Sequence, residues 1–345
     1  MIRDYLEISR LFNMGLTGVA PVLGALSMWT TNTPVTFATL LPLLILFCIG
    51  CLSHVYGFVI NDLVDIKVDK LSNELFARPL VSGSISRKKA TIFAVVCMIF
   101  SFIISIFFYK DLVSYIFLFS ILIIAYILAT IYNFASKKYP GMDFFVAGAV
   151  FFLILFGAAT ISTTQLLSNP LIWIVALIGA LQVLFMNMFN GAIKDIDHDE
   201  KGLANTLAIR LGAKTRKGKI TLPTSFKTVG YTVELVRSFL IFIPFLFLIP
   251  FNQIEEIAII LRIAILFIFT IITLFSIYKL FSIKTFNRNH IRKWIGIIVI
   301  VMYATTPIML SSLNPYIILV AFVPPLWFIL SNLVLHGTVL IPKTM

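Results

Sequence analysis

Long apolar stretches dominate the chain and alternate with short polar segments. Ten stretches approach or exceed the roughly 20 residues that a membrane-spanning helix needs. They are residues 12–31, 37–60, 90–109, 111–133, 144–163, 170–193, 233–252, 257–282, 292–311 and 315–336. Backbone polar groups in lipid must be satisfied within their own segment, so each stretch is predicted to be a helix. The pattern predicts an all-α, polytopic membrane helical bundle that forms a single transmembrane domain over residues 1–345.

Composition supports this interpretation. Hydrophobic residues make up 60% of the chain and charged residues only 12%, whereas about a quarter of the residues in a soluble domain are charged. The three cysteines, Cys48, Cys51 and Cys97, all lie within apolar stretches and have no metal-ligand spacing. They are therefore expected to be small buried apolar residues.

The net charge of +12 is unevenly distributed among the loops. Basic residues follow the second, fourth, sixth and eighth stretches, while Lys110 is the clear exception on the other side. Because basic loops stay in the cytoplasm, we expect a multi-pass cell-membrane protein with a cytoplasmic N-terminus. This asymmetry accounts for most of the charge, so no nucleic-acid partner is expected.

The polar, basic segment 212–230 is predicted to be a cytoplasmic loop insertion that could hold a short hairpin. Two roles are open for it. It can contact anionic lipid headgroups, or it can act as a lid over a substrate.

Acidic residues gather in two short windows. Seven of the 15 acids lie there: Asp62, Asp65, Asp69, Asp195, Asp197, Asp199 and Glu200. Each window directly follows an apolar stretch on the predicted cytoplasmic side. The spacings i, i+3, i+7 and i, i+4 place Asp62–Asp69 and Asp195–Asp199 each on one helical face, if the helices continue beyond the membrane. Crowded carboxylates repel one another unless a cation joins them.

These windows predict a magnesium site. Oxygen donors suit Mg²⁺, which binds through one or two carboxylates plus phosphate oxygens, so two facing clusters suggest a bridged diphosphate. The expected metal ligands are Asn61, Asp65, Asp69, Asp195 and Asp199, and the four aspartates among them are the expected catalytic residues. Asp62 and Asp197 are weaker candidates that would support the ligands. The alternative is that each window is a solvated acidic loop that caps helix ends.

Basic and amide side chains complete the expected site. Arg78, Lys137, Lys138 and Lys194 are candidates to bind the diphosphate, although cytoplasmic topology alone would also explain them. The substrate-pocket candidates Asn13, Asn187 and Asn190 lie in or at the ends of apolar stretches. Polar groups there usually face the bundle interior, where interhelical hydrogen bonding is an equal alternative.

The two acidic windows also resemble a known pattern. The first reads Asn61-Asp62-Leu-Val-Asp65-Ile-Lys-Val-Asp69 and continues into Arg78-Pro-Leu-Val-Ser-Gly-Ser-Ile-Ser86. The second, Asp195-Ile-Asp-His-Asp199, leads to Thr206-Leu-Ala-Ile-Arg-Leu-Gly212. Up to about residue 212, the chain is similar to the UbiA-type intramembrane prenyltransferases.

This resemblance implies a helical bundle around a central cavity. The family usually has nine spans, so ten stretches indicate an added or re-entrant helix, and the range is nine to ten transmembrane helices. The implied activity is Mg²⁺-dependent transfer of an isoprenyl group from an isoprenyl diphosphate donor to a hydrophobic or aromatic acceptor. An aromatic quinone precursor is the first expectation, and a glycerol-phosphate lipid is the second. A cation-coupled transporter is the alternative from another functional class.

Overall fold

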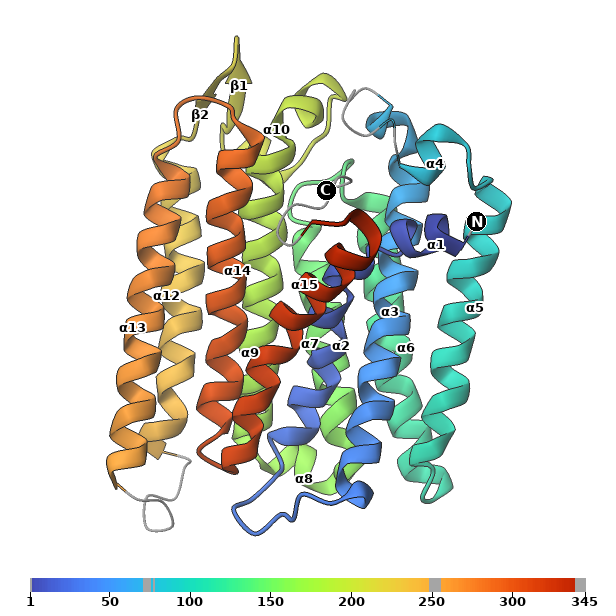
Figure 1. Cartoon of the computed structure of the whole chain (residues 1–345), viewed down its shortest axis with the longest axis vertical. Coiled ribbons are helices and arrows are strands. Elements are labelled where there is room, and N and C mark those ends of the chain that lie inside the picture. Colours follow the sequence, from blue (N-terminus) through green and yellow to red (C-terminus); the bar gives the residue numbers. More distant parts are fainter. Residues whose placement is uncertain (1, 71–75, 77, 248–255, 339–345) are drawn as a thin grey trace.

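The computed structural model describes residues 2–70, 76, 78–247 and 256–338, and most of them are helical. The longest helices run side by side along one axis (Figure 1). The helices are α1 (Ile2–Ile8), α2 (Leu11–Leu26), α3 (Phe37–Asp69), α4 (Pro79–Ser82), α5 (Arg87–Ser105), η2 (Ile106–Phe108), α6 (Leu112–Ala135), α7 (Asp143–Ile161), α8 (Thr163–Ser168), α9 (Pro170–Phe185), η3 (Met186–Gly191), α10 (Ala192–Lys201), α11 (Leu207–Arg210), α12 (Thr224–Phe247), α13 (Glu256–Phe281), α14 (Arg288–Leu310), η5 (Pro315–Phe322) and α15 (Val323–His336).

Nine helices within the described residues are long and apolar enough to cross a membrane, which confirms the predicted polytopic all-α fold. The remaining predicted span, 12–31, forms α2, which ends at Leu26 after 16 residues. A helix of this length covers about 24 Å, less than the roughly 30 Å of a bilayer core. The last predicted span, 315–336, consists of the 3-10 helix η5 followed by α15, and Pro324 lies at the start of α15, where proline is tolerated.

Both acidic windows are helical and lie at the same end of the bundle. The 33-residue α3 extends about 50 Å, so it continues well past an apolar core and carries Asp69 at its last position. The helix that starts at Pro170 continues through the π-helical η3 into α10. We call the end that holds Asp69 and α10 the motif end; it is the upper end in Figure 1.

The helix α12 begins at Thr224, nine residues before the predicted span 233–252, so the polar segment is shorter than the predicted 212–230. Glu234 and Arg237 lower the local hydropathy, yet both side chains are fully buried and form a bidentate ion pair with distances of 2.7 and 2.8 Å. Arg237 also donates to Thr305 of α14. The residues after Phe247 in this predicted span lie outside the described residues.

The polar segment contains a two-stranded antiparallel hairpin, β1 (Lys214–Arg216) and β2 (Lys219–Thr221). It is attached to its neighbours by backbone hydrogen bonds. The Ile220 amide donates to the Lys284 carbonyl, and the Phe286 amide donates to the Gly218 carbonyl. The Thr215 amide donates to the Glu200 carboxylate of α10. The hairpin therefore connects α10 to the loop that precedes α14.

The core of the bundle depends on a close crossing of α2 and α7. A Cβ atom added at Gly24 would overlap the Ile154 carbonyl, and one added at Gly157 would overlap the Pro21 carbonyl. Small residues allow helix backbones in a membrane to approach this closely. Because α2 and α7 both line the central cavity, their crossing also sets its width.

We therefore expect Gly157→Ala to destabilise the protein by about 1–3 kcal/mol, the usual penalty of overpacking. Thermal unfolding in detergent measures this effect. Gly296→Ala in α14 is the matched control, because nothing lies within 4 Å of its added Cβ. It should leave the unfolding temperature equal or higher. Equal unfolding temperatures for both variants would contradict the close crossing.

Candidate functional site

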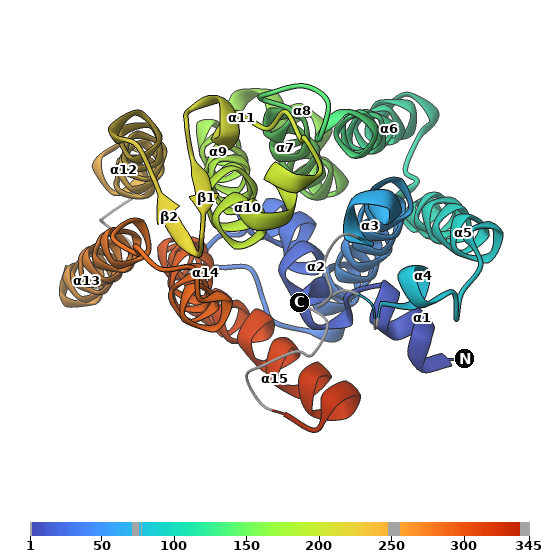
Figure 2. The same ribbon diagram turned by 90° about the horizontal axis from the view of Figure 1, so that it is seen from above.

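A cavity of about 900 Å³ lies in the centre of the bundle, and the acidic windows form part of its wall. The helices around it include α2, α3, α10, α14 and α15, which surround the middle of the molecule in the view from above (Figure 2). Charged residues line the cavity at the motif end. Apolar side chains such as Leu16, Leu153 and Ile300 line its deeper part.

On the α3 side, Asn61, Asp65 and Asp69 line the cavity. They are four residues apart, so they lie on one face of the helix. Asp65 and Asp69 are buried, with 9% and 7% of their surface exposed. Asp62 is outside the cavity lining and contacts Arg10 instead. The structure thus separates Asp62 from the other three.

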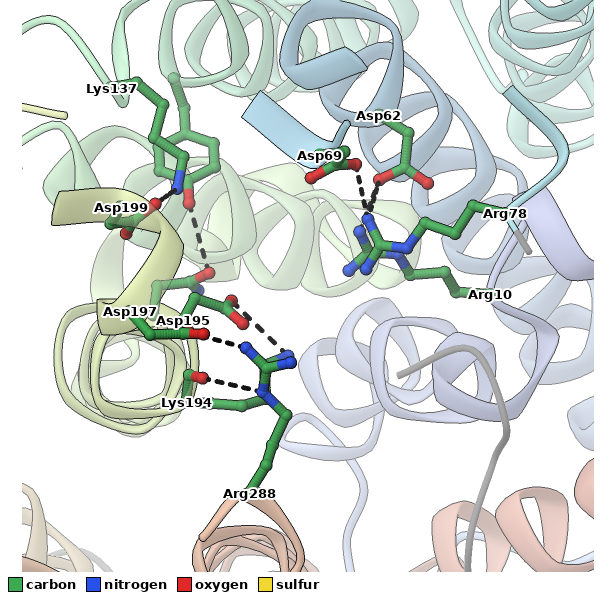
Figure 3. Close-up of polar contacts among 12 residues, drawn as sticks. Arg10, Asp62, Asp69, Arg78, Lys137, Lys194, Asp195, Asp197, Asp199 and Arg288 are labelled. Atoms are coloured by element: carbon green, nitrogen blue, oxygen red, sulfur yellow. Dashed lines mark hydrogen bonds and ion pairs between the residues drawn. The ribbon is translucent and has the colours of Figure 1, made fainter. Parts of the chain in front are cut away.

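On the α10 side, Asp195 and Asp199 line the cavity, again at a spacing of four residues. The intervening Asp197 lies away from the lining, with its Oδ1 2.8 Å from Nη2 of Arg288. Arg288 is the first residue of α14, and it also donates to the Lys194 carbonyl. Figure 3 shows this arginine reaching α10 from below. Asp197 therefore connects α10 to α14.

Two arginines neutralise the α3 carboxylates. Nη1 of Arg78 lies 2.7 Å from Oδ2 of Asp69 and 3.6 Å from Oδ1 of Asp62. Arg10, between α1 and α2, donates to the same oxygen of Asp62 (Figure 3). Burial opposes the charge of Arg78, but Asp62 and Asp69 outweigh it and raise the pKa of Arg78. The arginine therefore stays charged.

Two lysines play the corresponding role on the α10 side. Nζ of Lys137 lies 2.6 Å from Oδ1 of Asp199, and Nζ of Lys194 lies 3.7 Å from Oδ2 of Asp195. Burial opposes the charge of Lys137, but Asp199 and Asp65 outweigh it and raise the pKa of Lys137 above its ordinary value. Asp65 belongs to α3, so Lys137 interacts electrostatically with both acidic windows.

Of the other predicted residues, Asn13, Asn187 and Asn190 line the cavity. Lys138 is not among the described residues that line it. Its carbonyl accepts a hydrogen bond from the Asn205 side chain at 3.1 Å. The structure therefore distinguishes the two neighbouring lysines, which the sequence alone treated as equivalent.

The sequence did not single out several polar residues of the cavity wall. Tyr132 donates to Asn187 at 3.4 Å, and Asp143 lies at the start of α7. Arg292 and Lys293 line the cavity from α14. Arg292 and Lys293 could have been noticed in the sequence, because they are basic residues within the first turns of an apolar helix and not in the loop before it.

The family model for the UbiA prenyltransferase family matches residues 18–275, more than half of the chain. The chain belongs to this family. It is therefore a membrane-embedded prenyltransferase. It is 30% identical over 218 residues to the digeranylgeranylglyceryl phosphate synthase of Sulfolobus acidocaldarius, a match that covers 62% of this chain and 71% of that protein. It is 32% identical over 155 residues to the 4-hydroxybenzoate octaprenyltransferase of Shewanella pealeana, covering 43% and 50%.

The fold agrees with this membership. The structure of a UbiA homologue from Archaeoglobus fulgidus, bound to GPP and Mg²⁺, has a TM-score of 0.61 at 20% identity. The match covers 89% of this chain and 99% of that one. At this level of identity, the likeness establishes the shared helical architecture.

The residues of this UbiA-family site suit Mg²⁺. Asn61, Asp65, Asp69, Asp195 and Asp199 all offer oxygen donors to one cavity, and oxygen is the ligand that Mg²⁺ prefers. Within the described residues, no three His, Cys, Asp or Glu side chains form a compact metal-binding group. Mg²⁺ commonly takes only one or two carboxylates and completes its shell with phosphate oxygens and water. The donors on the two walls therefore fit a metal that is shared with a diphosphate.

The two neighbouring lysines supply a test with a built-in control. We expect Lys137→Gln to weaken the binding of a non-ionising isoprenyl diphosphate analogue by about tenfold, because a charge-assisted contact is lost. Lys138→Gln should stay within about twofold of the wild type, since that side chain is outside the cavity lining. Isothermal titration of the purified protein measures both affinities. Equal losses in the two variants would contradict the assignment.

Proposed function

We propose that this prenyltransferase moves an isoprenyl group from an isoprenyl diphosphate to an acceptor, with Mg²⁺ bound between α3 and α10. The observation that carries the proposal is the meeting of Asn61, Asp65 and Asp69 with Asp195 and Asp199 at one charged cavity end. Deeper in the same cavity, the lining becomes apolar. A donor with a charged head and a long hydrocarbon tail matches this change.

The donor's diphosphate lies at the motif end in this proposal. Arg78, Lys137 and Lys194 all line that part of the cavity, and each already contacts a carboxylate of the acidic windows. Each has further N–H groups that would donate hydrogen bonds to phosphate oxygens, for which arginine and lysine are well suited. Fixed positive charge at this place stabilises the negative charge that develops on the leaving diphosphate.

Asn61, Asp65, Asp69, Asp195 and Asp199 would hold the metal. Bound Mg²⁺ supplies Lewis-acid stabilisation of the diphosphate oxygens. The allylic C–O bond then breaks, and its electron pair leaves with the diphosphate. The acceptor forms the new bond to the allylic carbon and releases its proton.

The cavity protects the reacting carbon from water, because its deeper wall is apolar. Three phenylalanine side chains, Phe12, Phe58 and Phe328, belong to this wall. Aromatic faces attract positive charge, so these rings are suited to stabilise an allylic cation. Phe58 already stacks under the Arg10 guanidinium, 4.8 Å from the ring centroid.

For the acceptor, we propose a glycerol-phosphate lipid. The synthase relative from Sulfolobus acidocaldarius supports this choice, because it matches 62% of the chain. An aromatic ring, the first expectation from the sequence, is the second candidate. The Shewanella pealeana relative favours it over a smaller share, 43%. Mass spectrometry of products from both acceptor classes distinguishes the two.

We further propose that the motif end faces the cytoplasm. The basic residues Arg87, Lys88 and Lys89 begin α5 there, and the β1–β2 hairpin adds Lys214 and Arg216 at the same end (Figure 1). Such residues are retained on the cytoplasmic side. Both acidic windows would then draw on the cytoplasmic donor pool.

The metal ligands are tested by removing one carboxylate charge at a time. We expect Asp65→Asn and Asp195→Asn each to lower prenyl transfer by at least about 100-fold, and EDTA to abolish it in the wild type. The measurement is product formation by purified protein in saturating Mg²⁺.

Asp111→Asn is the matched control for these substitutions. Asp111 is exposed and caps α6, and asparagine is an equally good cap, so activity should be unchanged. Wild-type activity in either Asp65→Asn or Asp195→Asn would refute the proposed metal site.

A further inference from the structure

A third wall of the cavity carries positive charge in addition to that of the donor site. Asn289, Arg292 and Lys293 line the cavity from the first two turns of α14. This helix stands beside α10, on the side of the cavity away from α3 (Figure 2). Its first turn contains no acidic residue. The amides of a helix N-terminus favour bound anions, so the helix and its two cations attract the same kind of ligand.

The charge on α14 adds to an existing group of cations. Arg10, Arg78 and Lys194 line the same cavity as Arg292 and Lys293. The carboxylates of the acidic windows already have cationic partners. Arg78, for example, contacts Asp69 on α3, and Lys137 contacts Asp199 on α10. Further cations in the same cavity favour the binding of an additional anion there.

An independent observation lies deeper in the cavity. The Asn190 side chain is only 2% exposed and lines the cavity, yet neither its Oδ1 nor its Nδ2 hydrogen-bonds to any described residue. Leaving a buried amide unsatisfied is costly, so a polar ligand is expected at this point. Asn190 belongs to η3, a π-helical segment, and such segments are frequent at functional sites.

The positions of Asn190 and the α14 cations along their helices bring them to the same part of the cavity. Asn190 precedes Asp195 by five residues, about 7 Å along a helix, and therefore lies deeper than the expected metal. The donor's reacting carbon must also lie just below its diphosphate. Asn190 lies four residues before Lys194, and both line the cavity. The Lys194 carbonyl accepts a hydrogen bond from Arg288, which lies one turn before Arg292 on α14. The amide and the α14 cations thus border the same part of the cavity.

We propose that this part of the cavity is the acceptor site, and that it selects acceptors with an anionic group, either phosphate or carboxylate. Arg292 and Lys293 bind the anion at the start of α14. Asn190 hydrogen-bonds the acceptor's hydroxyl group and holds it beside the donor carbon. The proposal rests on the proposed prenyl transfer and names the chemistry that both acceptor candidates share.

The experiment measures equilibrium binding of two matched acceptor pairs, in the presence of Mg²⁺ and a non-ionising donor analogue. One pair is a glycerol-phosphate ether lipid and its dephosphorylated alcohol. The other is 4-hydroxybenzoate and its methyl ester. The wild type should prefer the anionic member of one pair by about tenfold or more. The pair that shows the preference identifies phosphate or carboxylate as the natural anion.

Three variants separate the two parts of the site. In Arg292→Gln and Lys293→Gln, affinity for the anionic member should fall by about tenfold, while affinity for its neutral partner and for the donor analogue changes less than twofold. In Asn190→Leu, both members of the pair should lose affinity together. Lys284→Gln is the matched control, because this exposed lysine lies in the loop before α14 and outside the cavity lining.

Two results would overturn the acceptor site: no anionic preference in the wild type, or equal loss of anionic and neutral acceptors in Arg292→Gln and Lys293→Gln. Because binding requires no chemistry, the outcome is separable from the proposed function. Anion-selective binding without product formation would refute the proposed transfer and leave the anion site intact. Product formation without anion selectivity would refute the anion site and leave the proposed transfer intact.

Discussion

Repulsion between carboxylates at one end of a membrane bundle is the constraint on which this structure depends. Asp65 and Asp69 on α3 and Asp195 and Asp199 on α10 share one cavity. Their charges can coexist because cations lie among them. Arg78 contacts the α3 group, and Lys194 belongs to α10 itself. The remaining cations, Arg10, Lys137 and Arg288, come from three further places in the chain. The ion pairs therefore attach the loops and helices of the motif end to one another.

The same ion pairs prepare the site for its substrate. Lys137 and Arg78 remain charged because neighbouring carboxylates raise the pKa of each. Cations held in this way are already placed where a diphosphate would bind, so little reorganisation is required on binding. The deeper, apolar part of the cavity suits the hydrocarbon tail of the donor. The helices α2 and α7, which both line the cavity, approach each other closely at Gly24 and Gly157.

Local features of this fold were predictable from the sequence, and long-range ones were not. Apolar stretches and four-residue spacings placed Asn61, Asp65, Asp195 and the helices that carry them, because both signals are contained within one segment. The start of α12 was misjudged because its first nine residues, 224–232, are mostly polar and include Lys227 and Gly230, so hydropathy assigned them to the preceding loop.

Contacts between residues far apart in the sequence could be identified only from the structure. Asp197 pairs with Arg288, 91 residues away, and no local pattern signals this contact. Lys137 and Lys138 have the same sequence context, but only Lys137 lines the cavity. From the sequence, the basic residues at the start of α14 indicate only membrane orientation. In the structure, Arg292 and Lys293 line the cavity.

A double-mutant cycle tests whether α3 and α10 act on one diphosphate. The affinity of a non-ionising isoprenyl diphosphate analogue in Mg²⁺ is measured for the wild type, Asp69→Asn, Asp199→Asn and the double variant. Groups that share one ligand network show coupling energies of about 0.5–3 kcal/mol. If both helices act on one diphosphate, the double variant loses clearly less binding free energy than the sum of the two single losses. Strictly additive losses would show two independent sites and contradict a shared diphosphate.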